Sequence, residues 1–139
     1  MASIADIEKE IIEDFELFDD WEGKYDYLIG LGKDLPLIDE KYKTDKYIVR
    51  GCQSRVWLHA SNEGAQVFYT ADSDAIITKG LVGLMIKVLN GQKAQDIAKA
   101  ELSFIDKIGL KEHLSQNRSN GLVSMIKQMK LYAFALSKN

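Results

Sequence analysis

The residue best suited to carry out chemistry in this sequence is Cys52, because it is the only thiol among 139 residues. It lies in the segment Arg50-Gly51-Cys52-Gln53-Ser54-Arg55, between two stretches that have the pattern of β-strands. A thiolate is a strong nucleophile, and a nearby cation such as Arg50 or Arg55 lowers the pKa of a thiol. The spacing does not show which arginine faces the sulfur. The competing interpretation is an inert buried cysteine, since free cysteine often behaves as a small hydrophobic residue.

The count of one cysteine excludes several other kinds of chemistry. A single cysteine cannot form a disulfide within the chain, and it cannot supply the three or four thiolates of a zinc or iron-sulfur site. The two histidines, His59 and His113, stand alone and 54 positions apart. We therefore predict no metal ligand, no bound cofactor and no catalytic base among them.

The charge pattern limits the possible partners. The sequence has 18 Lys and Arg against 21 Asp and Glu, with only three arginines and no basic run, so nucleic acid is not expected to bind. No apolar run approaches the ~18 residues of a membrane span, and the first residues lack the features of a secretion signal. We expect a cytoplasmic protein that has no membrane partner. Residues 1–22 hold nine acids and one lysine, which predicts the solvated face of a helix.

Two helices are expected before the cysteine. A pair typical of a capping box, Ser3 and Asp6, begins the first helix. Its apolar residues follow at spacings of three and four: Ile4, Ile7, Ile11, Phe15 and Phe18. Asp20 is suited to cap a second helix that carries Trp21, Tyr25, Leu28 and Ile29, and that Gly30 and Gly32 are expected to weaken and end.

Three short runs around the cysteine have the character of β-strands: residues 47–50, 55–60 and 65–71. The turn Ser61-Asn62-Glu63-Gly64 predicts a hairpin between the second and third runs. The segment that carries Cys52 therefore connects the first two runs, and such connections on a rigid scaffold are frequent places for reactive groups.

Helices are expected again after the strands. Asp72, Ser73 or Asp74 is suited to cap a helix that ends at Gly91, with the apolar residues Ile77, Leu81, Leu84, Met85 and Val88. Short helical pieces are expected at residues 94–100 and 103–108, and a last helix from about Ser119 carries Leu122, Met125, Ile126, Met129, Tyr132 and Leu136. This order predicts one α+β domain over residues 1–139, with helices packed on one side of a small antiparallel three-stranded sheet.

Four segments resemble the SufE family of sulfur-acceptor proteins. Residues 49–57, Val-Arg-Gly-Cys-Gln-Ser-Arg-Val-Trp, resemble the family signature V-x-G-C-Q-S-x-V-W. Residues 21–32 resemble W-x-x-x-Y-x-Y-L-I-x-L-G, residues 72–80 resemble D-S-D-x-x-I-x-x-G, and residues 114–121 resemble L-S-x-x-R-x-x-G. The matches follow in order over nearly the whole chain, and Asn117 in the small polar position before Arg118 is a conservative departure.

The resemblance implies a fold similar to SufE and IscU and a role in sulfur transfer. Cys52 would accept persulfide sulfur from a cysteine desulfurase that depends on pyridoxal phosphate, and the protein would stimulate that enzyme. It would then pass the sulfur to an iron-sulfur scaffold complex that contains SufB. The chain is thus expected to be a sulfur carrier and activator more than an enzyme in its own right.

Substrate or partner binding around Cys52 is expected of Gly51, Gln53, Ser54, Asp74 and Arg118, and Arg118 matches the arginine of the family motif. Each has a structural alternative: turn chemistry explains Gln53 and Ser54, a helix cap explains Asp74, and a surface cation near a helix start explains Arg118.

Three other functions compete with this interpretation. A sister acceptor of the CsdE type would serve a different desulfurase and sulfur destination. A cluster scaffold of the IscU type would be expected to have three cysteines, against the one present. An independent cysteine-dependent enzyme would need a base oriented on the thiol, and no Cys-His-Asn or Cys-His-Asp constellation is recognisable near Cys52.

Overall fold

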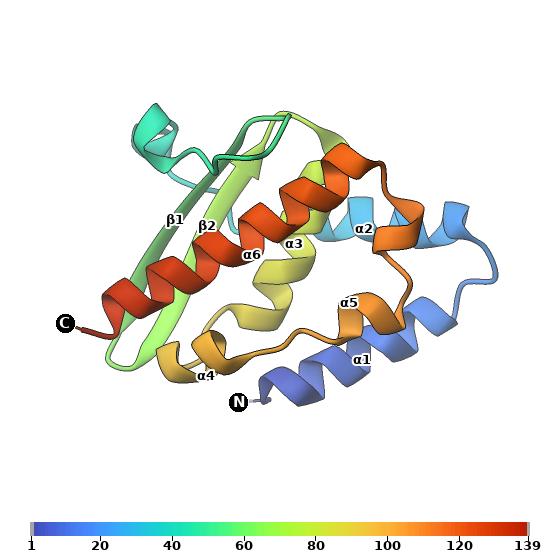
Figure 1. The fold of residues 1–139 in the computed structure, drawn as a ribbon, viewed down its shortest axis with the longest axis horizontal. Coiled ribbons are helices and arrows are strands. Elements are labelled where there is room, and N and C mark those ends of the chain that lie inside the picture. The colour runs from blue at the N-terminus through green and yellow to red at the C-terminus, as the bar shows by residue number, and fades with distance from the viewer. Residues whose placement is uncertain (1, 139) are drawn as a thin grey trace.

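The computed structural model describes residues 2–138 and shows a mixed α+β fold, in agreement with the predicted class (Figure 1). Its elements, in chain order, are α1 (Ile4–Glu16), α2 (Trp21–Lys33), the 3-10 turns η1 (Glu40–Tyr42) and η2 (Asp45–Tyr47), β1 (Val56–Glu63), β2 (Gln66–Ser73), α3 (Ile76–Leu89), α4 (Ala94–Lys99), α5 (Phe104–Lys107), the 3-10 turn η3 (Lys111–His113) and α6 (Gln116–Leu136).

The sheet among these residues is an antiparallel hairpin of β1 and β2, in which Val56 lies opposite Ser73. The expected three-stranded sheet is therefore wrong. The run at residues 47–50 makes a single bridge between Ile48 and Trp57, and the Val49 N–H donates to the Val56 carbonyl at 2.8 Å. Pairing stops there because a 3-10 turn precedes Ile48 and the chain turns at Gly51, which leaves too few extended residues for a strand.

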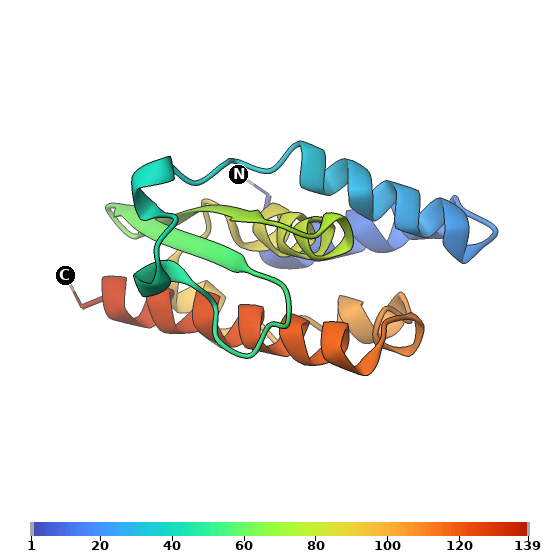
Figure 2. The same cartoon turned by 90° about the horizontal axis from the view of Figure 1, so that it is seen from above.

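Helix α6 covers the buried face of the hairpin. Alternate strand residues on this face are apolar and buried: Val56, Leu58, Val67, Tyr69 and Ala71. The Tyr69 hydroxyl donates to the Met129 carbonyl at 2.7 Å, which ties β2 to α6. Seen from above, α6 lies on one side of the hairpin and the loop that follows α2 lies on the other (Figure 2). A two-stranded hairpin is marginal alone, so this cover is what stabilises it.

Helices α2 and α3 approach each other through glycines. A Cβ added at Gly80 would lie 2.5 Å from the Leu28 carbonyl oxygen, and one added at Gly83 would lie 2.6 Å from the Leu31 carbonyl oxygen. Gly32 faces the α3 backbone in the same way. The expectation that glycines end the second helix is wrong, because α2 continues to Lys33 and Gly32 serves the contact between the two helices.

The acidic helix α1 begins with the predicted capping box of Ser3 and Asp6. Its acids do more than face solvent. Asp14 accepts a hydrogen bond from the Tyr27 hydroxyl at 2.8 Å, and Glu8 accepts one from the Phe104 N–H at 3.2 Å. Burial, together with Asp14, raises the pKa of Tyr27. Two of the acids therefore fix α1 to α2 and α5.

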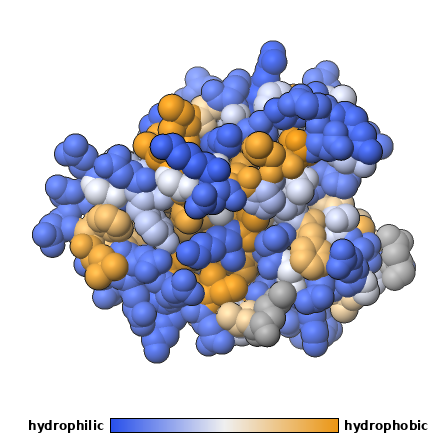
Figure 3. Space-filling model, turned by 180° about the vertical axis from the view of Figure 1, so that it is seen from behind, coloured by the Kyte–Doolittle hydropathy of each residue, from blue (hydrophilic) through white to orange (hydrophobic). Residues whose placement is uncertain are grey.

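Hydrophilic side chains cover much of the face opposite that of Figure 1, with hydrophobic patches between them (Figure 3).

Within residues 2–138, the helices are too short or too polar to cross a membrane.

The glycine contact between α2 and α3 predicts opposite effects of two neighbouring substitutions. A Cβ added at Gly32 would lie 2.9 Å from the Gly80 backbone nitrogen, whereas a Cβ at Gly30 meets nothing within 4 Å. Gly32→Ala should lower the free energy of unfolding by about 1–3 kcal/mol through overpacking. Gly30→Ala should raise it by about 0.5–1 kcal/mol, because alanine is the better helix former. Urea denaturation measures both, and equal effects at the two positions would contradict this packing.

Candidate functional site

The connection that carries Cys52, residues 50–55, packs against helix α6. Gly51 has a φ of 94°, in the region that favours glycine, and an added Cβ there would clash with the Ser124 hydroxyl on α6. A glycine at this position therefore allows both the backbone turn and the direct contact of residue 51 with α6.

The Cys52 thiol is half-buried against the backbone of α6. Its Sγ atom lies 3.5 Å from the Gly121 carbonyl oxygen, as the donor of a weak hydrogen bond. A Cβ added at Gly121 would lie 3.4 Å from the sulfur, so a larger residue would press on the thiol. Gly121 thus provides the space in which the thiol sits.

Two side-chain hydrogen bonds fix the position of the connection after Cys52. The Asn117 side-chain amide donates to the Gln53 Oε1 atom at 2.8 Å, which links the connection to α6. The Asp74 carboxylate accepts from the Arg55 N–H at 3.1 Å. The expected role of Asp74 as a helix cap is wrong: Ala75 is the N-cap of α3 and makes no side-chain cap bond, because β2 extends to Ser73 and Asp74 reaches back to Arg55.

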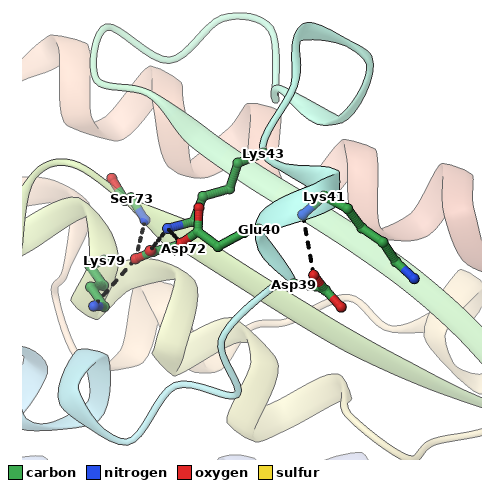
Figure 4. Close-up of polar contacts among 7 residues, drawn as sticks. All are labelled: Asp39, Glu40, Lys41, Lys43, Asp72, Ser73 and Lys79. Carbon is green, nitrogen blue, oxygen red and sulfur yellow. Dashed lines mark hydrogen bonds and ion pairs between the residues drawn. The ribbon is translucent and has the colours of Figure 1, made fainter.

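Asp72 fastens the segment upstream of the connection to the end of β2 (Figure 4). Its carboxylate pairs with Lys43 at 2.7 Å and with Lys79 on α3 at 3.3 Å, and Lys43 also reaches Glu40 at 3.0 Å. Burial by itself raises the pKa of Asp72, but the hydrogen bonds from Lys43, from the Ser73 N–H and from Lys79 outweigh it and hold this pKa below its usual range. The ion pairs therefore keep residues 39–43 on the hairpin, ahead of Cys52.

A cavity of about 230 Å³ lies beside the Cys52 thiol. Three separate parts of the chain form its wall: Cys52, Gln53 and Ser54 from the connection, Thr78 and Leu81 from α3, and Ser115, Asn117, Arg118, Gly121 and Met125 from the start of α6. Of the predicted site residues, Cys52, Gln53, Ser54 and Arg118 therefore meet in one place. Gly51 and Asp74 do not line the cavity. They set the backbone conformation of the connection, Gly51 through its positive φ and Asp74 through its bond to the Arg55 N–H.

The position of Arg118 differs from the expectation. Helix α6 begins at Gln116, not near residue 119, and its N-cap Ser115 accepts a hydrogen bond from the Arg118 N–H at 3.3 Å. Arg118 therefore belongs to the first turn of α6 and does not precede the helix. Thr78 carries no signal of its own in the sequence, although it lies inside a segment that carries the family resemblance, whereas Gly121 is the last residue of the motif at residues 114–121. Only the structure shows that α3, α6 and the connection bring both residues to the cavity.

The electrostatics of the thiol also differ from the expectation that flanking cations lower its pKa. Burial raises the pKa of Cys52. Arg50 and Arg55 are exposed and do not line the cavity, whereas Arg118 does. At neutral pH the thiol is therefore mostly protonated and poorly nucleophilic while the connection stays in this position.

The two histidines lie outside the cavity and have packing roles. The His59 ring stacks on Tyr42 at 4.0 Å between centroids, and the His113 ring stacks on Trp21 at 3.9 Å. No group of residues able to hold a metal ion occurs within the described residues. The candidate site in residues 2–138 is a half-buried cysteine beside a small polar cavity, on an α+β scaffold.

Comparison with known proteins identifies the family. A family model described as the Fe-S metabolism associated domain of SufE matches residues 9–133. The chain belongs to the SufE family, which is associated with iron-sulfur metabolism.

Individual relatives agree with this assignment. An uncharacterised SufE-like protein of Rhizobium meliloti is 43% identical over 126 residues, which cover 87% of this chain and 90% of that protein. SufE-like protein 1 of Arabidopsis thaliana, whose name describes it as chloroplastic and mitochondrial, is 38% identical over 92% of this chain and 35% of its own length. The solution structure of a hypothetical protein from Thermus thermophilus has the same fold, with a TM-score of 0.80 and 20% identity, and the match covers 96% of this chain and 97% of that one.

The close approach of the connection to α6 predicts the cost of substitution at Gly51. Gly51→Ala should lower the free energy of unfolding by more than the ~1 kcal/mol of a left-handed residue, because the added methyl group also displaces Ser124. Gly64→Ala is the matched control, since Gly64 has a φ of 61° and open space around it. Chemical denaturation compares the two variants, and an equal loss in both would show that the connection does not press on α6.

The buried position of the thiol predicts its pH dependence. Because burial raises the pKa of Cys52, its rate of alkylation by iodoacetamide should reach half-maximum at a higher pH than that of an unstructured peptide with the sequence of residues 50–55. The peptide has the same flanking arginines and therefore isolates the effect of the fold. A midpoint at or below that of the peptide would contradict the burial argument.

Proposed function

We propose that this protein is a sulfur acceptor that takes persulfide sulfur onto Cys52 from a cysteine desulfurase that depends on pyridoxal phosphate. The observation that carries the proposal is the half-buried Cys52 thiol, which lies beside a cavity that Arg118 also lines. Membership of the SufE family supports the link to iron-sulfur metabolism.

The transfer is a thiol exchange on a persulfide. The Cys52 thiolate attacks the outer sulfur of the desulfurase persulfide, a new S–S bond forms at Sγ, and the old S–S bond breaks. The desulfurase cysteine leaves as a thiolate and Cys52 becomes Cys52–S–SH. The sequence has no second cysteine that could attack this persulfide and release sulfide early. The sulfur is then handed on, and we propose an iron-sulfur scaffold complex that contains SufB as the recipient.

The resting position of the thiol suits a carrier that reacts slowly with molecules that do not dock beside it. Its raised pKa and partial burial limit reaction with other electrophiles. We propose that the connection moves when the desulfurase docks, so that Cys52 leaves Gly121 and faces the partner. Gly51, Gln53, Ser54, Asp74 and Arg118 would contact the partner or set the shape of this connection.

The setting of this activity is part of the proposal. We propose that the domain extends over residues 1–139 and works in the cytoplasm without a bound cofactor. A CsdE-type acceptor would use the same chemistry with a different desulfurase, so the partner defines the destination of the sulfur.

The proposal predicts that stimulation of the desulfurase depends on the sulfur atom of Cys52. With free cysteine as substrate, the wild-type protein should raise the rate of alanine formation by the cognate desulfurase, because the acceptor relieves the enzyme of its persulfide. Cys52→Ser should remove this stimulation, since the hydroxyl of serine cannot accept the sulfur.

Arg50→Gln is a suitable control, because Arg50 is exposed and does not line the cavity. Equal stimulation by the wild type and Cys52→Ser would overturn the acceptor mechanism and leave an allosteric role.

A further inference from the structure

Arg118 and Thr78 are polar side chains at the cavity beside Cys52 that have no side-chain partner in residues 2–138. The Arg118 guanidinium is exposed and makes neither an ion pair nor a side-chain hydrogen bond among these residues. Thr78 is only 6% exposed and lines the cavity, and its hydroxyl is bonded to no other group in the described part of the chain. Within that part, every fully enclosed side-chain polar atom has a partner, so the Thr78 hydroxyl is not fully enclosed, and this cavity is an open space that Thr78 lines.

The surroundings of these two side chains favour an anion. The cavity lies at the start of α6, where the first backbone N–H groups of a 21-residue helix carry partial positive charge. The residues that line the cavity include one cation and no carboxylate. Helix α6 itself contains no Asp or Glu from Gln116 to Leu136.

The size of the cavity limits the ligand. A cavity of about 150 Å³ is large enough for benzene, which has six non-hydrogen atoms, and this cavity measures about 230 Å³. This volume suits a molecule of about eight non-hydrogen atoms, the size of a free amino acid that carries one extra sulfur.

We propose that this cavity binds a free persulfide of a small amino-acid thiol, of the size of cysteine persulfide, and that Cys52 can take sulfur from it without a desulfurase. Arg118 and the first turn of α6 receive the carboxylate, and Thr78 donates its unused hydrogen bond to the ligand. The inference rests on the proposed role of Cys52 as a sulfur nucleophile, but it adds a second, low-molecular-weight source of sulfur.

The reaction needs no oxidant or reductant. The Cys52 thiolate attacks the outer sulfur of R–S–SH, an S–S bond forms at Sγ, and the S–S bond of the donor breaks. The products are R–S⁻ and Cys52–S–SH, so one sulfur atom moves without a change in its oxidation level.

The test compares cysteine persulfide, which has a free carboxylate, with the persulfide of cysteine methyl ester, which does not, and a peptide reference corrects for their different intrinsic reactivity. The rate of sulfur addition to Cys52 is followed by intact mass, and each rate is divided by that of a peptide with the sequence of residues 50–55. The folded protein should prefer the carboxylate donor by about tenfold, which is the effect of one charge-assisted hydrogen bond.

Two variants assign the preference to the cavity. Arg118→Gln should lower the corrected rate with cysteine persulfide about tenfold and remove the preference. Thr78→Val, which keeps the side-chain shape, should lower the rate with both donors. Lys127→Gln is the control, because Lys127 is an exposed cation on the same helix that does not line the cavity. Thermal unfolding checks that each variant is folded. If Thr78→Val does not fold, the result for Arg118→Gln decides the test.

A parallel reaction with the desulfurase and cysteine separates the two proposals. If the desulfurase loads Cys52 but the protein shows no preference for the carboxylate donor, or Arg118→Gln leaves the preference intact, the small-molecule site is wrong and the proposed function stands. If neither source loads Cys52, both proposals are wrong.

Discussion

The contact between the Cys52 thiol and the α6 backbone at Gly121 is the constraint around which the site is arranged. It requires a glycine in the helix, a left-handed glycine at Gly51 to begin the connection, and the hydrogen bond from Arg55 to Asp74 to close it. Each of these features brings segments distant in sequence to the same sulfur atom. The result is a half-buried thiol that lies against a helix and beside a small polar cavity.

The rest of the fold supports this arrangement mainly through helices, because the sheet has only two strands among the described residues. A hairpin of two strands would be marginal by itself, so its stability depends on α6 across its buried face and on α3, which packs closely against α2 through Gly80 and Gly83. The same two helices that stabilise the core, α3 and α6, also supply most of the cavity wall. The core and the candidate site therefore share their elements, and a change in helix position would be expected to alter the site.

Local hydrogen bonds and periodicity could be predicted from the sequence, whereas contacts between distant segments could not. The caps at Ser3 and Asp20 use residues three positions apart, so their patterns are visible in the chain. Asp74 has the same local pattern, but it bonds to Arg55 across the hairpin. Cys52 could be predicted as the reactive residue because it is unique and carries the family signature. Thr78 lies at the cavity only because α3 and α6 meet beside the thiol, and no spacing in the sequence records that meeting.

The central claim is that Cys52 is the residue that carries the sulfur, and the mass of the intact protein tests it most directly. After incubation with the cognate desulfurase and free cysteine, the account predicts a gain of about 32 Da, one sulfur atom, on the wild-type chain. The gain should map to the peptide that contains Cys52, disappear on reduction and be absent in Cys52→Ser. An unchanged mass under conditions in which the desulfurase turns over, or the same gain in Cys52→Ser, would contradict it.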